Sequence, residues 1–271
     1  MSGLAGASIE FVILAWNSEH YIGACLDSVL ALSARRLRVH VVDNGSQDAT
    51  GQILEELSGR HSELHVIHEP ENLGTTVSRN RALAHILPDT EFVCVLDSDT
   101  VVNQDAFDRL IDALVDHRDI GIIGPSMESS AGVRQLSGRN LPTLGIKLRK
   151  ACPISSVQAR GAALEVPSTP ALDGLQDVGY LLSACWVMPR RTLEIVGNLD
   201  ENIFYAPEDV DYCLRVHEAG LRVVYYERPV IVHEYQRISK KRLVSSTNAS
   251  HVGGLAYYFR KHGYLFRAPQ F

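Results

Sequence analysis

Hydrophobic and polar residues alternate along the first 125 positions in a way that predicts α/β structure. Short apolar runs, typical of buried strands, alternate with segments whose apolar residues recur at helical spacing. Strands joined by helices in this order form a mostly parallel sheet with helices packed on it. The expected strands are residues 9–14, 39–43, 64–68, 92–96 and 121–125. Helical faces are expected from Ile22, Cys25, Leu26, Val29 and Leu30 and from Phe107, Leu110, Ile111 and Leu114.

The pattern weakens between residues 126 and 178, where Gly, Pro and Ser are frequent and basic residues cluster near Arg139 and at 147–150. We interpret this stretch as a variable insertion near the substrate. Periodicity then returns with a buried strand at 181–189 and a helix at 207–220, which a proline opens and a glycine closes. Two short strands are expected after it, at 222–226 and 230–233.

The tail, residues 234–271, is basic and aromatic. A last helix is expected there, with one face formed by Leu255, Tyr258, Phe259 and His262. Such a tail could dock on a membrane face or help to hold an acceptor, and a helix packed on the domain is the alternative. The residues behind the first hypothesis are Lys240, Lys241, Arg242, Arg260, Lys261 and Arg267 with Tyr257, Tyr258, Phe259 and Phe266.

Composition narrows the possible partners and the compartment. A formal net charge of −6 over 271 residues argues against a general nucleic-acid binder. The five cysteines show no paired spacing, so they indicate buried thiols rather than disulfides or a zinc site. No apolar run approaches the roughly 20 residues that span a bilayer, and the first residues do not resemble a signal peptide. We therefore expect a cytoplasmic protein. The basic and aromatic tail suggests, as an alternative, a cytoplasmic protein with peripheral contact at the inner membrane face.

Polar residues follow the expected strands at the ends where ligands bind to parallel sheets. Because the carboxyl ends of parallel strands face one crevice, these residues are expected to converge. They are Trp16 and Asn17, Asp43, Asn44 and Ser46, Glu71, Asn72 and Gly74, and Asp97, Ser98 and Asp99. Neither GxGxxG nor GxxxxGK[ST] occurs at these positions, which argues against dehydrogenases and phosphate-loop NTPases.

The run VCVLDSDTVV places Asp97 and Asp99 two residues apart at the end of a buried strand. Carboxylate oxygens are the ligands that Mg²⁺ and Mn²⁺ prefer, and a metal held there keeps positions open for a diphosphate. A polar strand end or helix-capping acids would explain the same spacing.

Four further residues have a functional and a structural interpretation. Asp43 could accept the N3 hydrogen of a uracil or thymine ring, whereas the Asp-Asn-Gly sequence also suits a turn. Glu208 and Asp209 stand in the first turn of a helix, where a carboxylate could take a proton from a hydroxyl or simply complement the helix dipole. His233, after a short apolar strand, could complete a metal site or be structural.

Taken together, the motifs resemble a family-2 inverting glycosyltransferase of the GT-A fold. The matching segments, in order, are VILAWNSEHYIGACLDSVL, VVDNGSQDAT, ENLGTTVSRNRAL, VCVLDSDTVV and SACWVMPRRTLEIVGNLDENIFYAPEDVDYCLRVHEAG. They cover most of residues 9–233, and the bacterial rhamnosyltransferase-like members are the most similar. The resemblance implies a Rossmann-like, mostly parallel sheet flanked by helices, with a small acceptor-side region.

The resemblance also implies a role for each site residue. Asp209 would be the catalytic base, and Glu208 would support it or contact the acceptor. Asp99 would ligate Mg²⁺ or Mn²⁺, and His233 would be a further contact to the metal or the diphosphate. The nucleotide sugar would be bound by Ala15, Asn17, Asp43, Asn72, Arg79, Asp97 and Ser98. Residues 1–125 would bind the donor, 126–233 would hold the acceptor and the catalytic residues, and 234–271 would form the tail.

The reaction that follows is a single displacement from a UDP- or dTDP-sugar, with dTDP-rhamnose among the candidates, to a hydroxyl of a saccharide or lipid-linked saccharide. Two alternatives come from other classes. A sugar-1-phosphate nucleotidyltransferase would need a glycine-rich basic loop after the first strand, and AWNSEHY stands there instead. A non-catalytic nucleotide-sugar-binding protein would be expected to lack one of the acids.

Overall fold

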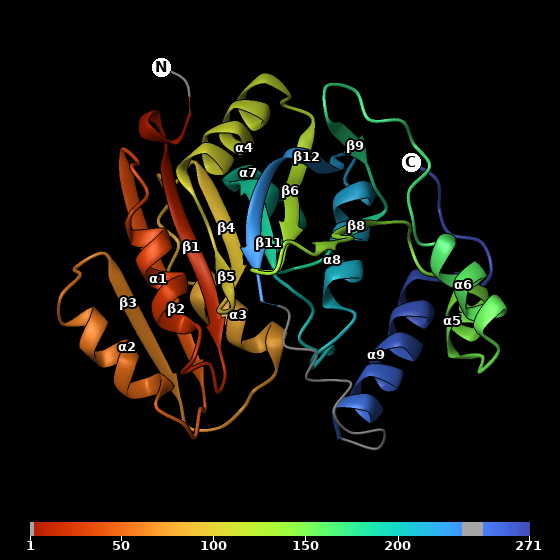
Figure 1. Cartoon of the computed structure of the whole chain (residues 1–271), viewed down its shortest axis with the longest axis horizontal. Coiled ribbons are helices and arrows are strands. Elements are labelled where there is room, and N and C mark those ends of the chain that lie inside the picture. The colour runs from red at the N-terminus through yellow and green to blue at the C-terminus, as the bar shows by residue number, and fades with distance from the viewer. Residues whose placement is uncertain (1–2, 235–245) are drawn as a thin grey trace.

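A computed structural model describes residues 3–234 and 246–271, which form an α/β fold with a twisted mixed sheet through its middle (Figure 1). The strand order is β3-β2-β1-β4-β11-β6-β12-β5, with β7 paired to β6 and β9 to β12, while β8 and β10 form a separate pair. The strands are β1 Ser8–Ala15, β2 Arg36–Asn44, β3 Leu64–Glu69, β4 Phe92–Asp97, β5 Thr100–Val101, β6 Ile120–Glu128, β7 Arg134–Gln135, β8 Gly138–Arg139, β9 Leu175–Asp177, β10 Tyr180–Leu181, β11 Cys185–Pro189 and β12 Arg222–His233. The helices are the 3-10 turn η1 Leu4–Gly6, α1 Ile22–Leu30, α2 Thr50–Ser58, α3 Thr75–Leu83, α4 Gln104–Asp116, α5 Leu144–Ala151, α6 Ser155–Ala163, α7 Arg190–Val196, α8 Glu208–Glu218 and α9 Ser246–His262.

The first four strands confirm the parallel half of the sheet that the apolar runs predict. Strand β1 pairs in parallel with β2 on one side and β4 on the other, and β2 pairs in parallel with β3. Almost every residue of β1 is buried, as expected for a strand covered on both faces. The antiparallel strand β11 then joins β4 to β6, which makes the sheet mixed.

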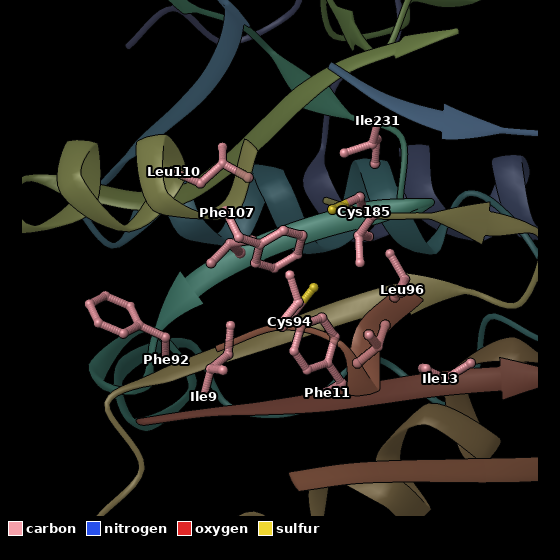
Figure 2. Close-up of a cluster of buried hydrophobic side chains, with 14 of the residues drawn as sticks. Ile9, Phe11, Ile13, Phe92, Cys94, Leu96, Phe107, Leu110, Cys185 and Ile231 are labelled. Atoms are coloured by element: carbon pink, nitrogen blue, oxygen red, sulfur yellow. The ribbon is translucent and has the colours of Figure 1, made fainter. Parts of the chain in front are cut away.

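Two hydrophobic cores lie on the two faces of the sheet. In one, alternate residues of β1 and β4 pack against α1, α2 and α4, and the rings of Phe11 and Phe107 lie 5.3 Å apart (Figure 2). In the other, Val12, Val93 and Val95 belong to the cluster that includes residues of α3, α8 and α9. The alternation of side chains along each strand therefore feeds both cores.

The later elements differ from the expected boundaries in three places. The two strands expected at 222–226 and 230–233 are one strand, β12, whose register against β6 shifts between Tyr226 and Val230. Pro229 lies in this irregular stretch and has no N–H to donate to a ladder, which accounts for the break in the pattern. The strand expected at 181–189 divides into β10 and β11. The insertion at 126–178 contains α5, α6 and several short strands.

The expected tail helix is α9, and it packs on the domain. Tyr258 is fully buried, Phe259 is nearly so, and Leu255 packs against the same core. These contacts favour the packing-helix alternative for this part of the tail. Lys240, Lys241 and Arg242, on which the membrane hypothesis also depended, lie outside the described residues. No helix within the described residues is long and apolar enough to cross a membrane.

Buried charge pairs fix α9 to α8. Asp211 of α8 accepts hydrogen bonds from Lys261 Nζ at 2.6 Å and His262 Nε2 at 2.9 Å, and Arg215 Nε lies 3.0 Å from its other oxygen. Although burial acts in the opposite direction, the hydrogen bonds from His262 and Lys261 lower the pKa of the Asp211 carboxyl. The ionised carboxylate therefore stabilises the docked helix.

We predict that Asp211→Asn lowers the free energy of unfolding by about 3 kcal/mol near neutral pH, because it removes the buried carboxylate that Lys261, His262 and Arg215 share. Since the pKa of Asp211 is lower in the folded state, its contribution is complete above the unfolded pKa of about 3.9 and is lost as pH falls through the folded pKa. Urea unfolding of both proteins as a function of pH measures this. A difference between the two proteins that stays constant down to strongly acidic pH would contradict the assignment.

Candidate functional site

The carboxyl ends of three strands place the predicted polar residues side by side. In the pairing register, Ala15 at the end of β1 lies opposite Asp43, and Leu14 lies opposite Asp97. Asp97 ends β4, and the chain then turns through Ser98 and Asp99 into β5. The ends of β1, β2 and β4 therefore bring Asp43 and Asp97 to the same edge of the sheet.

Asp97, Asp99 and His233 form a group whose possible ligand atoms all lie within 4.8 Å of one another. Strand pairing brings the histidine there, because β12 is antiparallel to β5 and His233 lies opposite Thr100. His233 Nε2 is 3.3 Å from Asp99 Oδ1, and the amide of Glu234 donates to the Asp99 carbonyl at 2.9 Å. Two carboxylates and an imidazole are a donor set that Mn²⁺ or Mg²⁺ can use.

Gln135, which no sequence motif indicated, holds the imidazole of His233 from the other side. Its side-chain Nε2 donates to the carbonyl oxygen of His233 at 2.7 Å, and its Oε1 lies 2.8 Å from His233 Nδ1. Because the amide nitrogen is engaged as a donor, the amide oxygen must accept from Nδ1–H. In the neutral imidazole this arrangement leaves the lone pair of Nε2 on the side of Asp99, as metal-binding histidines require, whereas the protonated imidazole donates from Nε2 to Asp99.

The charges in this group influence one another. Burial and the neighbouring Asp99 raise the pKa of Asp97, and Arg79 and His233 act in the opposite direction. Burial lowers the pKa of His233, but its hydrogen bond to Asp99 and the charge of that residue raise the pKa overall. Both shifts reflect the closeness of the two carboxylates, whose mutual repulsion a bound cation would offset.

The guanidinium of Arg79 connects this group to helix α8. Arg79 is only 2% exposed. Its Nη2 donates to Asp97 Oδ1 at 2.6 Å and to the carbonyl of Ser183 at 3.2 Å, and its Nη1 donates to Glu208 Oε1 at 3.2 Å. One buried cation therefore bridges the end of β4 and the first turn of α8. These bonds direct its guanidinium towards protein carboxylates.

The two acids at the start of α8 differ in their surroundings. Glu208 is buried and accepts a hydrogen bond from Ser183 Oγ at 2.9 Å. Burial, together with the charge of Asp209, raises the pKa of Glu208 to about 8. Asp209 is half-buried, and its Oδ1 accepts from the amide of Val210 at 2.8 Å. Burial also raises the pKa of Asp209. Because Asp209 is less buried than Glu208, it is the more accessible proton acceptor of the two.

The remaining predicted donor-binding residues form a polar layer around the strand ends. Asp43 Oδ1 accepts from the amide of Ser46 at 3.1 Å, and its Oδ2 lies 3.2 Å from His68 Nδ1. Asn17, at a positive φ of 49°, accepts from the amide of Gln47 at 2.9 Å. These contacts order the loops after β1 and β2.

Two other predicted residues are engaged with neighbouring loops. Ser98 is buried with its hydroxyl 2.8 Å from that of Ser18. Asn72 Oδ1 accepts from the amide of Gly74 at 2.9 Å and from Asn44 Nδ2 at 3.1 Å. Gly74 has a φ of 84° and lies so close to Phe204 that a Cβ atom would meet its backbone, so this turn favours glycine.

Helix α3 carries Arg79 and is fixed by polar contacts to the segment that precedes α8. Thr75 donates its amide to the Phe204 carbonyl at 2.6 Å, and Thr76 Oγ1 donates to the Ile203 carbonyl at 2.7 Å. The side-chain amide of Asn80 both donates to and accepts from the backbone of Leu199, at 2.9 and 3.0 Å. The loop before the half-buried Asp209 is thereby held against helix α3, which packs on the parallel half of the sheet.

Comparison with known proteins agrees with this geometry. The family model described as glycosyl transferase family 2 matches residues 10–160, more than half of the chain. The pre-mycofactocin glycosyltransferase of Mycobacterium tuberculosis is 29% identical over 209 residues, which are 76% of this chain and 39% of that protein. The N-acetylglucosaminyl-diphospho-decaprenol L-rhamnosyltransferase of the same organism is 24% identical over 271 residues, covering 96% of this chain and 87% of that protein.

Solved structures support the fold. The mannosyltransferase PcManGT from Pyrobaculum calidifontis, in complex with GDP-Man and Mn²⁺, superposes with a TM-score of 0.63 at 17% identity. The match covers 97% of this chain and 66% of that one. The GT-A fold expected from the sequence motifs is therefore confirmed.

The bridging position of Arg79 can be tested by its effect on stability. We predict that Arg79→Met lowers the free energy of unfolding by about 3–5 kcal/mol, because two carboxylates lose their buried cation. Arg81→Met on the same helix is the matched control, since its side chain is largely exposed and its carboxylate contact to Glu69 is 3.7 Å. Chemical denaturation should show a change of at most about 0.5 kcal/mol for this control. Equal effects of the two substitutions would contradict the bridging role.

Proposed function

The chain belongs to glycosyl transferase family 2, and from this premise we propose that it moves a sugar from a nucleotide diphosphate sugar to an acceptor hydroxyl. The observation that carries the proposal is that Arg79 links an Asp-Asp-His group suited to a metal with Glu208, which precedes the half-buried Asp209 in the first turn of α8. A donor diphosphate needs a cation, and an acceptor hydroxyl needs a base. The site has residues suited to both tasks.

In this proposal Asp99 and His233 hold Mg²⁺ or Mn²⁺, with Asp97 beside them on the ribose side of the nucleotide. A metal held there would supply positive charge to the departing diphosphate. The PcManGT complex, which contains GDP-Man and Mn²⁺, supports this use of the fold. Gln135 keeps His233 oriented, and Arg79 keeps Asp97 oriented, so the ligand atoms stay in place when donor enters.

For the nucleotide, we propose a pyrimidine, with UDP- and dTDP-sugars as the first candidates. Asp43 is buried at the end of β2, and each of its oxygens can accept a second hydrogen bond, which suits the N3–H of uracil or thymine. Ala15, Asn17, Asn72 and Ser98 line the neighbouring turns. The similarity to an L-rhamnosyltransferase supports dTDP-rhamnose as one donor to test, and the GDP-Man of the PcManGT complex makes GDP-mannose the comparison.

For the chemical step, we propose that Asp209 deprotonates the acceptor hydroxyl while the sugar is displaced from the opposite face, with inversion at the anomeric carbon. Glu208 supports Asp209 through its bonds to Arg79 and Ser183. In this scheme residues 1–125 bind the donor and residues 126–233 hold the acceptor.

The acceptor we propose is a hydroxyl of a saccharide carried on a lipid, as the name of the M. tuberculosis rhamnosyltransferase suggests. The acids of α8, Glu208 and Asp209, argue against a protein that only binds nucleotide sugars. Such a protein has no need of a base in addition to the metal-binding residues. A nucleotidyltransferase is disfavoured because the turn after β1 lacks a basic glycine-rich loop.

We predict that Asp209→Asn folds and binds donor but reduces turnover by about 10²-fold or more, because an amide cannot accept the proton. Glu208→Gln should have a milder effect. In the wild type, the rate should fall as pH drops through the pKa of Asp209, which burial raises, and the Asn variant should lack this dependence. Transfer rates measured with a donor and acceptor identified by thermal-shift screening check this prediction. Near-wild-type turnover of Asp209→Asn would disprove the mechanism.

Metal affinity provides a second prediction. Asp99→Ala should abolish metal-dependent donor binding, and Gln135→Leu should weaken Mn²⁺ binding by about 10- to 100-fold, because the imidazole loses the bond that fixes its tautomer. Manganese titration followed by electron paramagnetic resonance measures both. In a His233→Ala background, Gln135→Leu should cause no further loss. An additional loss there would show that Gln135 acts on something other than the imidazole.

A further inference from the structure

Three basic side chains from the insertion surround one buried carboxylate, Glu165. Arg139 Nη1 lies 3.0 Å and Lys150 Nζ 2.5 Å from Glu165 Oε2, and Lys147 Nζ lies 3.8 Å from Oε1. The Glu165 side chain is 4% exposed, whereas the three basic side chains are 25–33% exposed. All three cations therefore reach both the carboxylate and solvent.

The cluster has more positive charge than its own carboxylate can neutralise. Three cations and one anion leave two positive charges. The Oε1 atom of Glu165 has no hydrogen-bond partner, and Lys147 is too far from it to form a hydrogen bond. Burial lowers the pKa of Lys147, and Glu165 only partly offsets this effect. A second anion at this place would stabilise the ammonium group.

The cluster lies next to the proposed base. Strand β8 pairs with β10 so that Arg139 is opposite Tyr180, and β10 packs against α8, on which Asp209 lies. The charges of Lys147 and Arg139 both act to lower the pKa of Asp209, which shows that they are close enough to influence it. An anion bound by the cluster would thus lie near the point where an acceptor is deprotonated.

Exposed apolar side chains accompany the cluster on helices α5 and α6, which lie together at one edge of the molecule (Figure 1). Leu148 of α5 is 61% exposed, and Ile154, Leu164 and Val166 near the ends of α6 are also exposed. The last residues join this surface through a bond from the Leu144 amide to the Leu265 carbonyl at 2.7 Å, next to Phe266, which is 69% exposed. Charge and apolar surface therefore lie side by side.

We propose that Arg139, Lys147 and Lys150 bind the phosphate or diphosphate that joins the acceptor saccharide to its aliphatic chain. The inference rests on the proposed glycosyl transfer, and it assigns the insertion as the acceptor's anion site. Lysine and arginine are the usual phosphate partners in proteins. The exposed apolar side chains of α5 and α6 contact the start of the aliphatic chain, and the saccharide extends from the phosphate towards Asp209.

The experiment measures binding of farnesyl diphosphate and of inorganic pyrophosphate by calorimetry in the presence of EDTA, which prevents capture of either probe by metal at the donor site. Lys147→Gln is the test variant, because Arg139 and Lys150 still pair with Glu165. Arg149→Gln is the matched control, since it removes one charge from the same helix and its guanidinium contacts only the Gly145 carbonyl in the described residues. Thermal melting verifies that both variants are folded.

We expect Lys147→Gln to weaken both probes by about tenfold, the loss of one charge-assisted contact, while Arg149→Gln stays within about twofold of wild type. Farnesyl diphosphate should bind more tightly than pyrophosphate. Wild-type affinity in Lys147→Gln, or an equal loss in Arg149→Gln, would overturn the proposal. Mn²⁺-dependent binding of UDP and dTDP, measured separately, tests the proposed function, so its failure and the failure of this inference are distinguishable.

Discussion

The buried guanidinium of Arg79 is the interaction on which the geometry of the site depends. It bonds to Asp97 at the end of β4, to the carbonyl of Ser183 and to Glu208 at the start of α8. Charges removed from water are costly unless they are paired, and Arg79 is the buried cation that pairs with the partly exposed Asp97 and the buried Glu208. The side chain of Arg79 therefore sets how far the group of Asp97, Asp99 and His233 lies from the acids of α8.

Helix α3 explains how this cation can be buried. The helix has few apolar residues, and its buried positions are mostly polar: Thr75, Thr76, Ser78, Arg79 and Asn80. These side chains satisfy backbone groups of the 199–204 segment and the side chain of Asn44. The two halves of the protein are thus joined by hydrogen bonds at the site and by apolar packing farther from it.

This difference also explains what could be predicted from the sequence. The strands of the parallel half and the acid pair at Asp97 and Asp99 follow from apolar runs and their polar ends, because burial on both faces leaves a clear pattern. Helix α3 has no such pattern, so its motif was evident only through a family resemblance. Gln135 and His233 are brought together by strand pairing across 98 positions, and no local signal in the sequence connects them. The same is true of Arg139, Lys147 and Glu165 in the insertion.

The proposed mechanism requires a divalent metal beside Asp99 and His233, on the donor side of Arg79 and within the same site as Asp209. The direct measurement is a crystal structure with Mn²⁺ and a pyrimidine nucleoside diphosphate, in which anomalous scattering locates the manganese. We expect one strong peak at coordination distance from Asp99 and His233, with the diphosphate on its open side and Asp209 facing the space beyond the terminal phosphate. A nucleotide bound without manganese at these residues, or manganese bound elsewhere in the chain, would contradict the mechanism.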